Sequence, residues 1–250
     1  MSFGKTGWEG TEPADNGGGD YEQYAPRRLW IPKPKDDGTQ YTKRVMFLDS
    51  KPFCFHEHSL FKITNSTKDR CICLAKANMD ERGCPVCDKD LWAYFIGYFT
   101  IIDMGDVRYG NDGSVTLEGW RNKDGDLFQF TRKALGAKIG GKDKPGMLQE
   151  YRRQMNIRGG NIVGCVFDVT RSGKLVETIG DKVDFVERVE PSKWGEYFSS
   201  LGADDAKNEL ELDPFDWIEV FKPHTYEQLQ NICGVKKQSG SGARSEGAGY

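Results

Sequence analysis

Hydrophobic residues fall into short runs along this chain, and most of these runs have the length of strands. Apolar and polar positions alternate at 53–61 and 127–131, which is the period of a strand with one buried face. Residues 91–102 are mostly hydrophobic at odd-numbered and even-numbered positions alike. Such a strand is either covered on both faces or fills a barrel core on one side and presents rings to a ligand on the other. We expect further strands at 29–31, 43–48, 115–117, 162–170 and 183–189.

Helical spacing occurs only late in the chain. Apolar residues from Met147 to Met155 recur at helical spacing after Pro145 and before Gly159-Gly160, so we expect one helix there. The repeated strand–helix alternation of a doubly wound sheet is missing. Short strands with one late helix instead predict a mainly β, α+β chain built on a small closed barrel. Beyond Pro191 we expect three short helices, at 194–201, 214–221 and 225–232.

Composition divides the chain into four parts. Residues 1–26 contain Gly17-Gly18-Gly19 and few aliphatic side chains, which is typical of a disordered arm. Residues 234–250 are rich in glycine and serine, which is typical of a flexible tail. Between them we expect the strand-rich domain at 27–190 and an acidic helical extension at 191–233.

Thiol and imidazole side chains gather in one stretch of the strand-rich domain. Cys84-Pro85-Val86-Cys87 spaces two thiols so that both sulfurs face one side of a tight turn. Cys71 and Cys73 precede this turn, and His56 and His58 precede them. Reduced, buried cysteines without a metal are the alternative. The paired spacing beside histidines favours a metal ion, with zinc as the first candidate.

A tetrahedral zinc ion needs four ligands, and we expect His58, Cys84 and Cys87 to supply three of them. The fourth is Cys71 or Cys73, which lie two residues apart and therefore share one face of a strand. We favour Cys73 because it is nearer to the Cys84–Cys87 turn. Four protein ligands leave no position for a substrate, so this zinc would be structural rather than catalytic. The zinc subdomain would be an insertion at 56–90.

Charge is distributed unevenly, although the formal net charge is only -3. Residues 27–158 carry 24 basic and 17 acidic side chains, whereas residues 159–222 carry 7 basic and 14 acidic ones. A basic domain beside an acidic segment suits a polyanionic ligand, and scatter around neutrality is the alternative.

Cysteine usage and hydropathy indicate the kind of cellular compartment in which the protein functions. Seven cysteines, mostly grouped as ligands and without an apolar leader, favour a reducing compartment over a disulfide scaffold. The longest apolar run, 91–102, is too short to span a bilayer, so we expect no membrane association.

Motifs of several common enzyme classes are missing from the sequence. The chain has no nucleotide-binding Gly-rich loop, no Gly-x-Ser-x-Gly turn and no His-Glu-x-x-His helix. Gly140-Gly141-Lys142 lacks the spacing of a phosphate loop and the Ser or Thr that follows it. We therefore expect a binding protein rather than an enzyme.

An ordered string of segments carries a family resemblance. It consists of Trp30 with Pro32, Arg44–Asp49, Glu57-His58, Cys73 with the Cys84–Cys87 turn, Gly97–Asp103 and Gly164–Arg171. Taken in this order, from Arg28 to Val189, the string resembles the zinc-containing single-stranded-DNA-binding proteins of tailed bacteriophages. Such proteins often end in an acidic tail that recruits replication partners, whereas the last residues here are neutral to basic.

The resemblance implies an oligonucleotide-binding barrel, the OB-fold, with a zinc subdomain inserted between strands. It implies zinc ligation by His58, Cys73, Cys84 and Cys87. It also implies that the protein binds and protects single-stranded DNA during phage replication, recombination and repair, in the cytoplasm of the infected bacterial host.

Sequence-independent binding of single strands combines rings that stack on bases with cations that contact phosphates. For stacking we expect Trp30, Phe55, Trp92, Tyr94, Tyr98, Trp120 and Phe130. For phosphates we expect Lys43, Arg44, Arg70, Arg121, Lys123, Arg132 and Lys133. Some of these rings will belong to the core instead.

The acidic segment 204–219 interleaves seven carboxylates with large apolar side chains. A solvated acidic run has no need of such side chains, so we expect this segment to dock on a basic and apolar surface. That surface is either the protein's own DNA groove or a replication or recombination protein. A helical pair packed on the barrel is the alternative.

A phage transcription or recombination regulator is the second interpretation of the whole chain. It would use the zinc subdomain to bind a protein partner, and it would co-purify with that partner whether or not DNA is present. A single-strand binder should instead be sensitive to salt and indifferent to base sequence.

Overall fold

A computed structural model describes residues 26–66, 69–121, 127–141, 145–203 and 210–234, except for the side chains of 120–121 and 127–128. The expected arm at 1–26 and tail at 234–250 lie almost wholly outside the described residues. The chain divides into two compact units. The first comprises Met1–Glu57 and Tyr94–Lys222, and the second comprises His58–Ala93 and Pro223–Tyr250.

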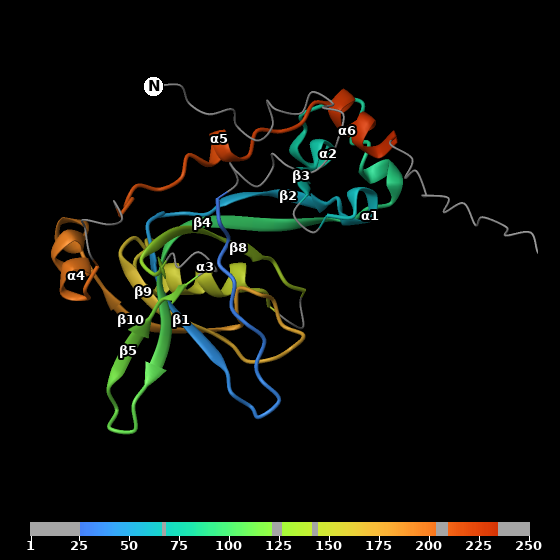
Figure 1. Ribbon diagram of the computed structural model, residues 1–250. Helices are drawn as coiled ribbons and strands as arrows, with labels where there is room; N and C mark the ends of the chain where they lie inside the picture. The colour runs from blue at the N-terminus through green and yellow to red at the C-terminus, as the bar shows by residue number, and fades with distance from the viewer. Residues whose placement is uncertain (1–25, 67–68, 122–126, 142–144, 204–209, 235–250) are drawn as a thin grey trace, which may run out of the picture. The chain divides into compact units, whose positions relative to one another are not determined.

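The first unit is built on a mainly antiparallel sheet, which confirms the prediction of a mainly β chain (Figure 1). Strands β10, β9, β1, β4 and β2 are neighbours in that order, and β5 and β8 also pair with β4. Their bounds are β1 Tyr41–Phe47, β2 Phe53–Ser59, β4 Ala93–Tyr109, β5 Val115–Glu118, β8 Thr131–Lys138, β9 Cys165–Arg171 and β10 Lys182–Arg188. A separate antiparallel ribbon joins β6 (Trp120–Arg121) to β7 (Leu127–Phe128).

The sheet formed by the described strands is open, so the predicted closed barrel is wrong for this part of the chain. The expected strand at 29–31 is instead an extended stretch beside β8. Leu29 N donates to Ala134 O (2.8 Å), and Ala134 N donates to Arg27 O (2.8 Å). Further along, Ile31 N donates to Thr178 O (2.7 Å). Because residues 27–29 take the second edge of β8, this edge is not available to β10.

Aromatic side chains fill the core of the first unit on one face of the sheet. There α3 (Met147–Ile157) buries Leu148 and Tyr151 against the strands. Phe47 meets Phe99 and Phe167 edge to face, with ring centroids 5.1 and 5.5 Å apart. Edge-to-face pairs of this kind add about 0.5–1.5 kcal/mol each beyond the burial of their area. The helix expected at 147–155 therefore forms, because its apolar stripe completes this core.

Strand β4 bends, and it pairs with different strands along its length. Its 17 residues pair with β8 near one end and with β5 near the other. The register against β1 shifts between Arg44 and Val45, and Gly105 lies nearby at φ 111°. A Cβ atom at Gly105 would lie 2.7 Å from the carbonyl oxygen of Glu118, so only glycine fits this bend.

The opposite face of the sheet, here called the outer face, is largely covered by the end of the first unit. Helix α4 (Trp194–Ser200), after the 3-10 turn η3 (Pro191–Lys193), buries Phe198 against Met46 and Ile102. Residues 210–221, here called the strap, continue this cover and contain the short helix α5 (Trp217–Val220). Two of the three expected late helices are thus present in this unit.

The second unit is a small module of short elements. A core of apolar side chains and thiols, which includes Cys71, Cys73, Cys84 and the fully buried Leu229, holds them together. Its elements are α1 (Phe61–Thr64), β3 (Arg70–Ile72), α2 (Leu74–Ala77), the 3-10 turn η2 (Cys87–Lys89) and α6 (Tyr226–Gly234). Strand β3 pairs with β2. None of the helices in the described ranges is long and apolar enough to cross a bilayer.

Candidate metal centre

Four side chains of the second unit converge on one point. His58, Cys73, Cys84 and Cys87 each offer one ligand atom, and these atoms all lie within 4.8 Å of one another. His58 Nε2 lies 3.7 Å from Cys84 Sγ and 3.5 Å from Cys87 Sγ. Cys73 Sγ lies 3.5 Å from Cys87 Sγ. The prediction that a His/Cys cluster here can hold a metal ion is confirmed.

These distances fit a tetrahedral ion. Zn–S bonds of about 2.3 Å and Zn–N bonds of about 2.0 Å place neighbouring ligand atoms of a tetrahedron about 3.5–3.8 Å apart. Three of the six separations, 3.5, 3.5 and 3.7 Å, fall in this range, and all six are within 4.8 Å. Three thiols and one imidazole are also the donor set of many structural zinc sites.

Short elements bring the four ligands together from distant parts of the sequence. His58 lies near the end of β2, and Cys73 is the N-cap residue of α2, directly after β3. Cys84 and Cys87 flank the turn into η2. Backbone N–H groups of Leu74, Val86 and Cys87 point to the Cys84 sulfur, as expected for a metal-binding turn.

Cys71 is buried like Cys73 but is not a member of the four-ligand cluster. It lies within β3, whereas Cys73 lies one residue beyond the end of this strand, at φ -72° and ψ 109°. A strand that continued through both thiols would place them on one face and leave the choice open. Because the strand ends at Ile72, only the later thiol is carried to the Cys84–Cys87 turn.

Electrostatics within the cluster favour thiolate at one sulfur and oppose it at another. Burial raises the pKa of Cys84, but hydrogen bonds from His58 and the backbone outweigh this effect and lower the pKa to about 6. Burial and the nearby thiols of Cys73 and Cys84 raise the pKa of Cys87 to about 12. Negative charge on one sulfur thus opposes charge on the next. A dication would remove this conflict, because metal ligation requires deprotonated thiols.

The cluster is closed to substrates. His58, Cys73 and Cys84 are at most 1% exposed, and Val86, Leu74 and Leu229 pack around them. All four donor atoms come from the protein, so a tetrahedral ion would have no open position. The arrangement therefore suits a structural metal. The second ring nitrogen of His58, Nδ1, is buried and has no hydrogen-bond partner among the described residues.

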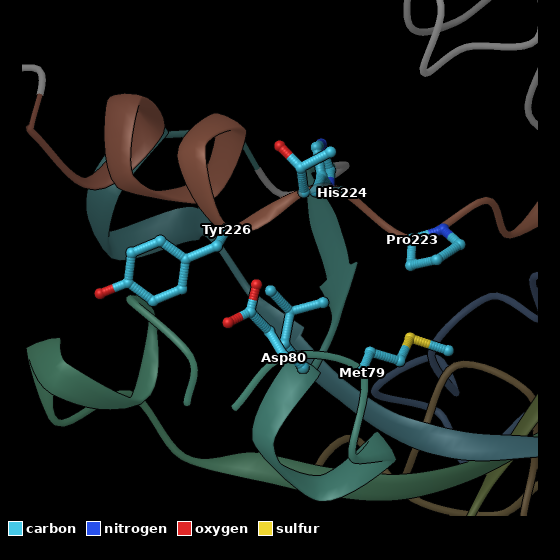
Figure 2. A pocket seen from close by; sticks show the side chains of 7 residues that line it. Met79, Asp80, Pro223, His224 and Tyr226 are labelled. Atoms are coloured by element: carbon cyan, nitrogen blue, oxygen red, sulfur yellow. The ribbon is translucent and has the colours of Figure 1, made fainter. Parts of the chain in front are cut away.

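A cavity of about 420 Å³ lies elsewhere in the second unit, beside the start of α6 (Figure 2). Figure 2 shows Met79 and Pro223 on one side of it and Tyr226 on the other. Asp80, on its lining, is bound through both carboxylate oxygens by Arg82, which holds the pKa of Asp80 down to about 2. Arg82 also bonds Glu227 and lies 4.1 Å from the Tyr226 ring centroid. The polar groups here thus fasten α6 to the 79–83 loop.

Three cations expected to contact phosphates are instead held in ion pairs. Lys43 and Lys133 are buried, and both contact the carboxylate of buried Asp103, at 3.3 and 2.6 Å. Arg44 binds both carboxylate oxygens of Asp168, at 2.7 and 2.8 Å. The sequence could not show these partners, because each acid lies far away along the chain.

The strap contacts Arg132. Its guanidinium donates to the carbonyl oxygen of Asp213 (2.9 Å), pairs with the carboxylate of Glu211 and lies 4.3 Å from the ring centroid of Phe215. Arg70 begins β3 and is partly buried. Lys123 and the side chains of Trp120 and Arg121 lie outside the described residues.

The rings expected to stack on bases divide into two groups. Phe55 and Tyr98 are buried on the outer face, where Phe221 of the strap lies 4.9 and 4.5 Å from them. Phe130 packs on Phe198 of α4 at 5.8 Å. By contrast, Trp30 is 57% and Trp92 86% exposed, and Tyr94 is half-buried.

The acidic segment is described only from residue 210 onward, so Asp204, Asp205 and Glu209 lie outside the described residues. The described part packs on the outer face. Trp217, 7% exposed, donates through Nε1 to Asp49 (3.2 Å), whose pKa is raised by burial. Phe215 N donates to Thr100 Oγ1 (2.9 Å). Residues 210–221 thus pack on the sheet, as in the alternative of a helical pair packed on the barrel, but they contain one short helix rather than two.

A cluster of polar residues on the outer face is not recognisable in the sequence. Glu57 of β2, 1% exposed, accepts hydrogen bonds from Tyr94 Oη (2.5 Å) and Tyr98 Oη (2.7 Å). Arg28 Nη2 lies 3.7 Å from Glu57, and Lys138 Nζ lies 4.2 Å from the Tyr94 ring centroid. Hydrophobic spacing can place Tyr94 on a strand, but only the pairing of β4 with β2 and β8 brings these side chains together.

Comparison with known proteins identifies no relative of this chain: no family model, no curated protein and no solved structure matches it.

Proposed function

We propose that this protein binds and protects single-stranded DNA without sequence specificity, in phage DNA replication, recombination and repair. A structural zinc ion in the second unit stabilises the fold, and the protein has no catalytic role. The cytoplasm of the infected host is the proposed location, and replication or recombination proteins are the proposed partners of the acidic segment 204–219.

The order of strands in the first unit is the observation that carries this proposal. Along the chain, β1, β4 and β8 are followed by α3 and then by β9 and β10. Strand β1 pairs with both β4 and β9, β8 pairs with β4, and β10 pairs with β9. An OB-fold is a five-stranded, partly open Greek-key barrel, and it binds oligonucleotides on the face of its second and third strands. These five strands suit that description, and β4 and β8 are the second and third.

The chemistry of the accessible side chains supports the same ligand. Trp30 is exposed, and two residues before it Arg28 is exposed next to β8. Rings and cations presented together bind single strands of any sequence, because every base has a face and every nucleotide has a phosphate. Residues 27–158 as a whole carry the excess of basic side chains that such a ligand requires.

The metal cluster supports the structural role given to zinc. Its ligands come from β2, the start of α2 and the turn before η2, so one ion would tie together the short elements of the second unit. In small modules of this kind, the free energy of metal binding is also free energy of folding.

Competition between nucleic acids tests the proposed function. A labelled oligothymidine bound to the protein should be displaced equally by single-stranded competitors of different sequences. A duplex of the same length should displace it at least about tenfold less effectively, since paired bases cannot offer their faces to rings. Preference for one sequence, or for duplex, would contradict the proposal.

A further inference from the structure

The outer face of the first unit retains one accessible aromatic position on β4. Tyr98 is fully buried beneath Phe221 and Trp217 of the strap, with ring centroids 4.5 and 5.8 Å away. Tyr94, four residues earlier on the same strand, is half-buried. Residues at even positions share this face of β4, so both rings point to the same side of the sheet. A ligand that reaches this face would meet Tyr94 rather than Tyr98.

The ring of Tyr94 is held in place by its neighbours. Its hydroxyl donates to Glu57 Oε2 (2.5 Å), and the other carboxylate oxygen of Glu57 accepts from Tyr98. Lys138 Nζ lies 4.2 Å from the Tyr94 ring centroid, in the range of a cation–π contact. A ring that is already ordered loses little conformational entropy when a ligand stacks on it.

Two cations border this ring. The side chain of Arg28 is 40% exposed and lies 3.7 Å from Glu57, at the long end of ion-pair distances. Lys138 is half-buried and ends β8. Glu177 is a second acid near Lys138: burial raises the pKa of Glu177, and the lysine lies close enough to oppose this rise. The two acids formally balance the two cations, so the position has no net positive charge and suits at most a single phosphate.

We propose that Tyr94, Lys138 and Arg28 form a nucleotide subsite, in which one unpaired base stacks on Tyr94 and its phosphate contacts Lys138 and Arg28. Glu57 is the positioning residue that fixes the phenol. The subsite rests on the proposed function and locates part of it. It takes single-stranded nucleic acid, because a base must leave its own stack to lie on the ring.

Tyr109 supplies a matched control for the ring. It lies on the same strand, is 63% exposed, and also donates its hydroxyl to a carboxylate, that of Asp168 (3.3 Å). Tyr94→Ala should weaken the affinity for a labelled oligothymidine by about 5- to 150-fold, the range of one lost stacking contact. Tyr109→Ala should leave it unchanged. Tyr94→Phe keeps the ring and should lose much less than Tyr94→Ala.

The salt dependence of binding tests the proposed contact between Lys138 and a phosphate. Lys138→Gln should reduce the slope of log affinity against log salt concentration by about 0.7, the value for one phosphate contact on a single strand. Lys182→Gln, which replaces an exposed lysine on β10, should leave the slope unchanged. Comparison of Lys138→Gln with Lys182→Gln tests the subsite even if Tyr94→Ala fails to fold.

The outcomes separate the subsite from the function. Should the wild-type protein bind single strands while Tyr94→Ala binds like Tyr109→Ala, or Lys138→Gln keep the wild-type slope, the subsite is wrong and the function stands. Absence of wild-type binding to single strands would overturn both.

Discussion

Candidate metal ligands can be recognised in the sequence, because their spacing has a local cause. A pair of thiols two residues apart forms a turn that directs both sulfurs to one side, whatever the rest of the fold does. Cys84 and Cys87 can therefore be assigned from their spacing alone. The choice between Cys71 and Cys73 depends on where β3 ends, which the sequence does not mark.

Replacement of one ligand tests this assignment. Cys87→Ser removes a thiolate from the cluster, so purified protein should contain much less than one zinc ion per chain by mass spectrometry under native conditions. Its thermal stability should fall as well, because structural zinc contributes on the order of 10 kcal/mol to small modules.

Cys71→Ser is the matched control, since Cys71 is also buried in the second unit but is not part of the cluster. It should keep its zinc and lose little stability. Equal loss of zinc in both variants, or zinc-free wild-type protein, would contradict the assignment.

Single residues that bind a polyanion are much harder to recognise. Lys43 and Lys133 both contact Asp103, which is 0% exposed, and Lys43 also pairs with Asp106 at 2.9 Å. Leaving either ammonium buried without its carboxylate partners would be costly. Nothing in the sequence near either lysine marks these partners. Long-range pairing converts an apparent phosphate ligand into a structural ion pair, and only the arrangement of β1, β4 and β8 shows the difference.

Elements are predicted well where hydrophobic spacing is regular. Helix α3 and strands β1, β2, β9 and β10 lie close to their expected positions. Helix α3, β1 and β9 bury a face or stripe in the core, whereas β10 is largely exposed and pairs with β9 at the edge of the sheet. Closure of the barrel is not predictable in this way. It depends on which segment takes the second edge of β8, and residues 27–29 do so through two backbone hydrogen bonds.

The last helix belongs to a different part of the molecule than its sequence position indicates. Residues 225–232 are expected to belong to an extension of the barrel domain, but α6 belongs to the second unit with the metal cluster. Its Leu229 is fully buried beside cysteines of the candidate metal centre, and Arg82 holds Glu227 at 2.6 Å. The stability of α6 should therefore depend on the metal.

Hydrogen exchange after chelation tests this dependence. Removal of the metal should accelerate exchange of backbone amides in residues 70–90 and in α6 by about tenfold or more, because the local opening free energy falls. Amides of α3, in the first unit, serve as the internal control and should be unaffected. Unchanged protection of α6 would show that the metal does not hold it.

In the whole molecule, the two units carry different candidate sites. The second unit contains the His/Cys cluster, and the first contains the sheet with the proposed DNA-binding face. The uneven charge of the chain can be read from the sequence. The position of the strap cannot, since the apolar residues of segment 204–219 indicate only that it docks, and the described part docks on the outer face itself.

The strap therefore restricts which part of the outer face can meet DNA. It covers Phe55 and Tyr98 and contacts Arg132, all of which the sequence predicts to bind DNA. The end of the face near Tyr94 and Lys138 remains partly exposed. The proposed binding surface is accordingly smaller than the basic and aromatic composition of the chain indicates.

Single-strand binding is tested by a titration of labelled single-stranded and duplex DNA of equal length at two salt concentrations. We expect the single strand to bind more tightly at both concentrations. We also expect affinity to fall as salt rises, with a slope of about -0.7 for each phosphate contacted. Equal affinity for the two forms, or affinity for single strands that does not change with salt, would show that the protein does not bind single strands as proposed.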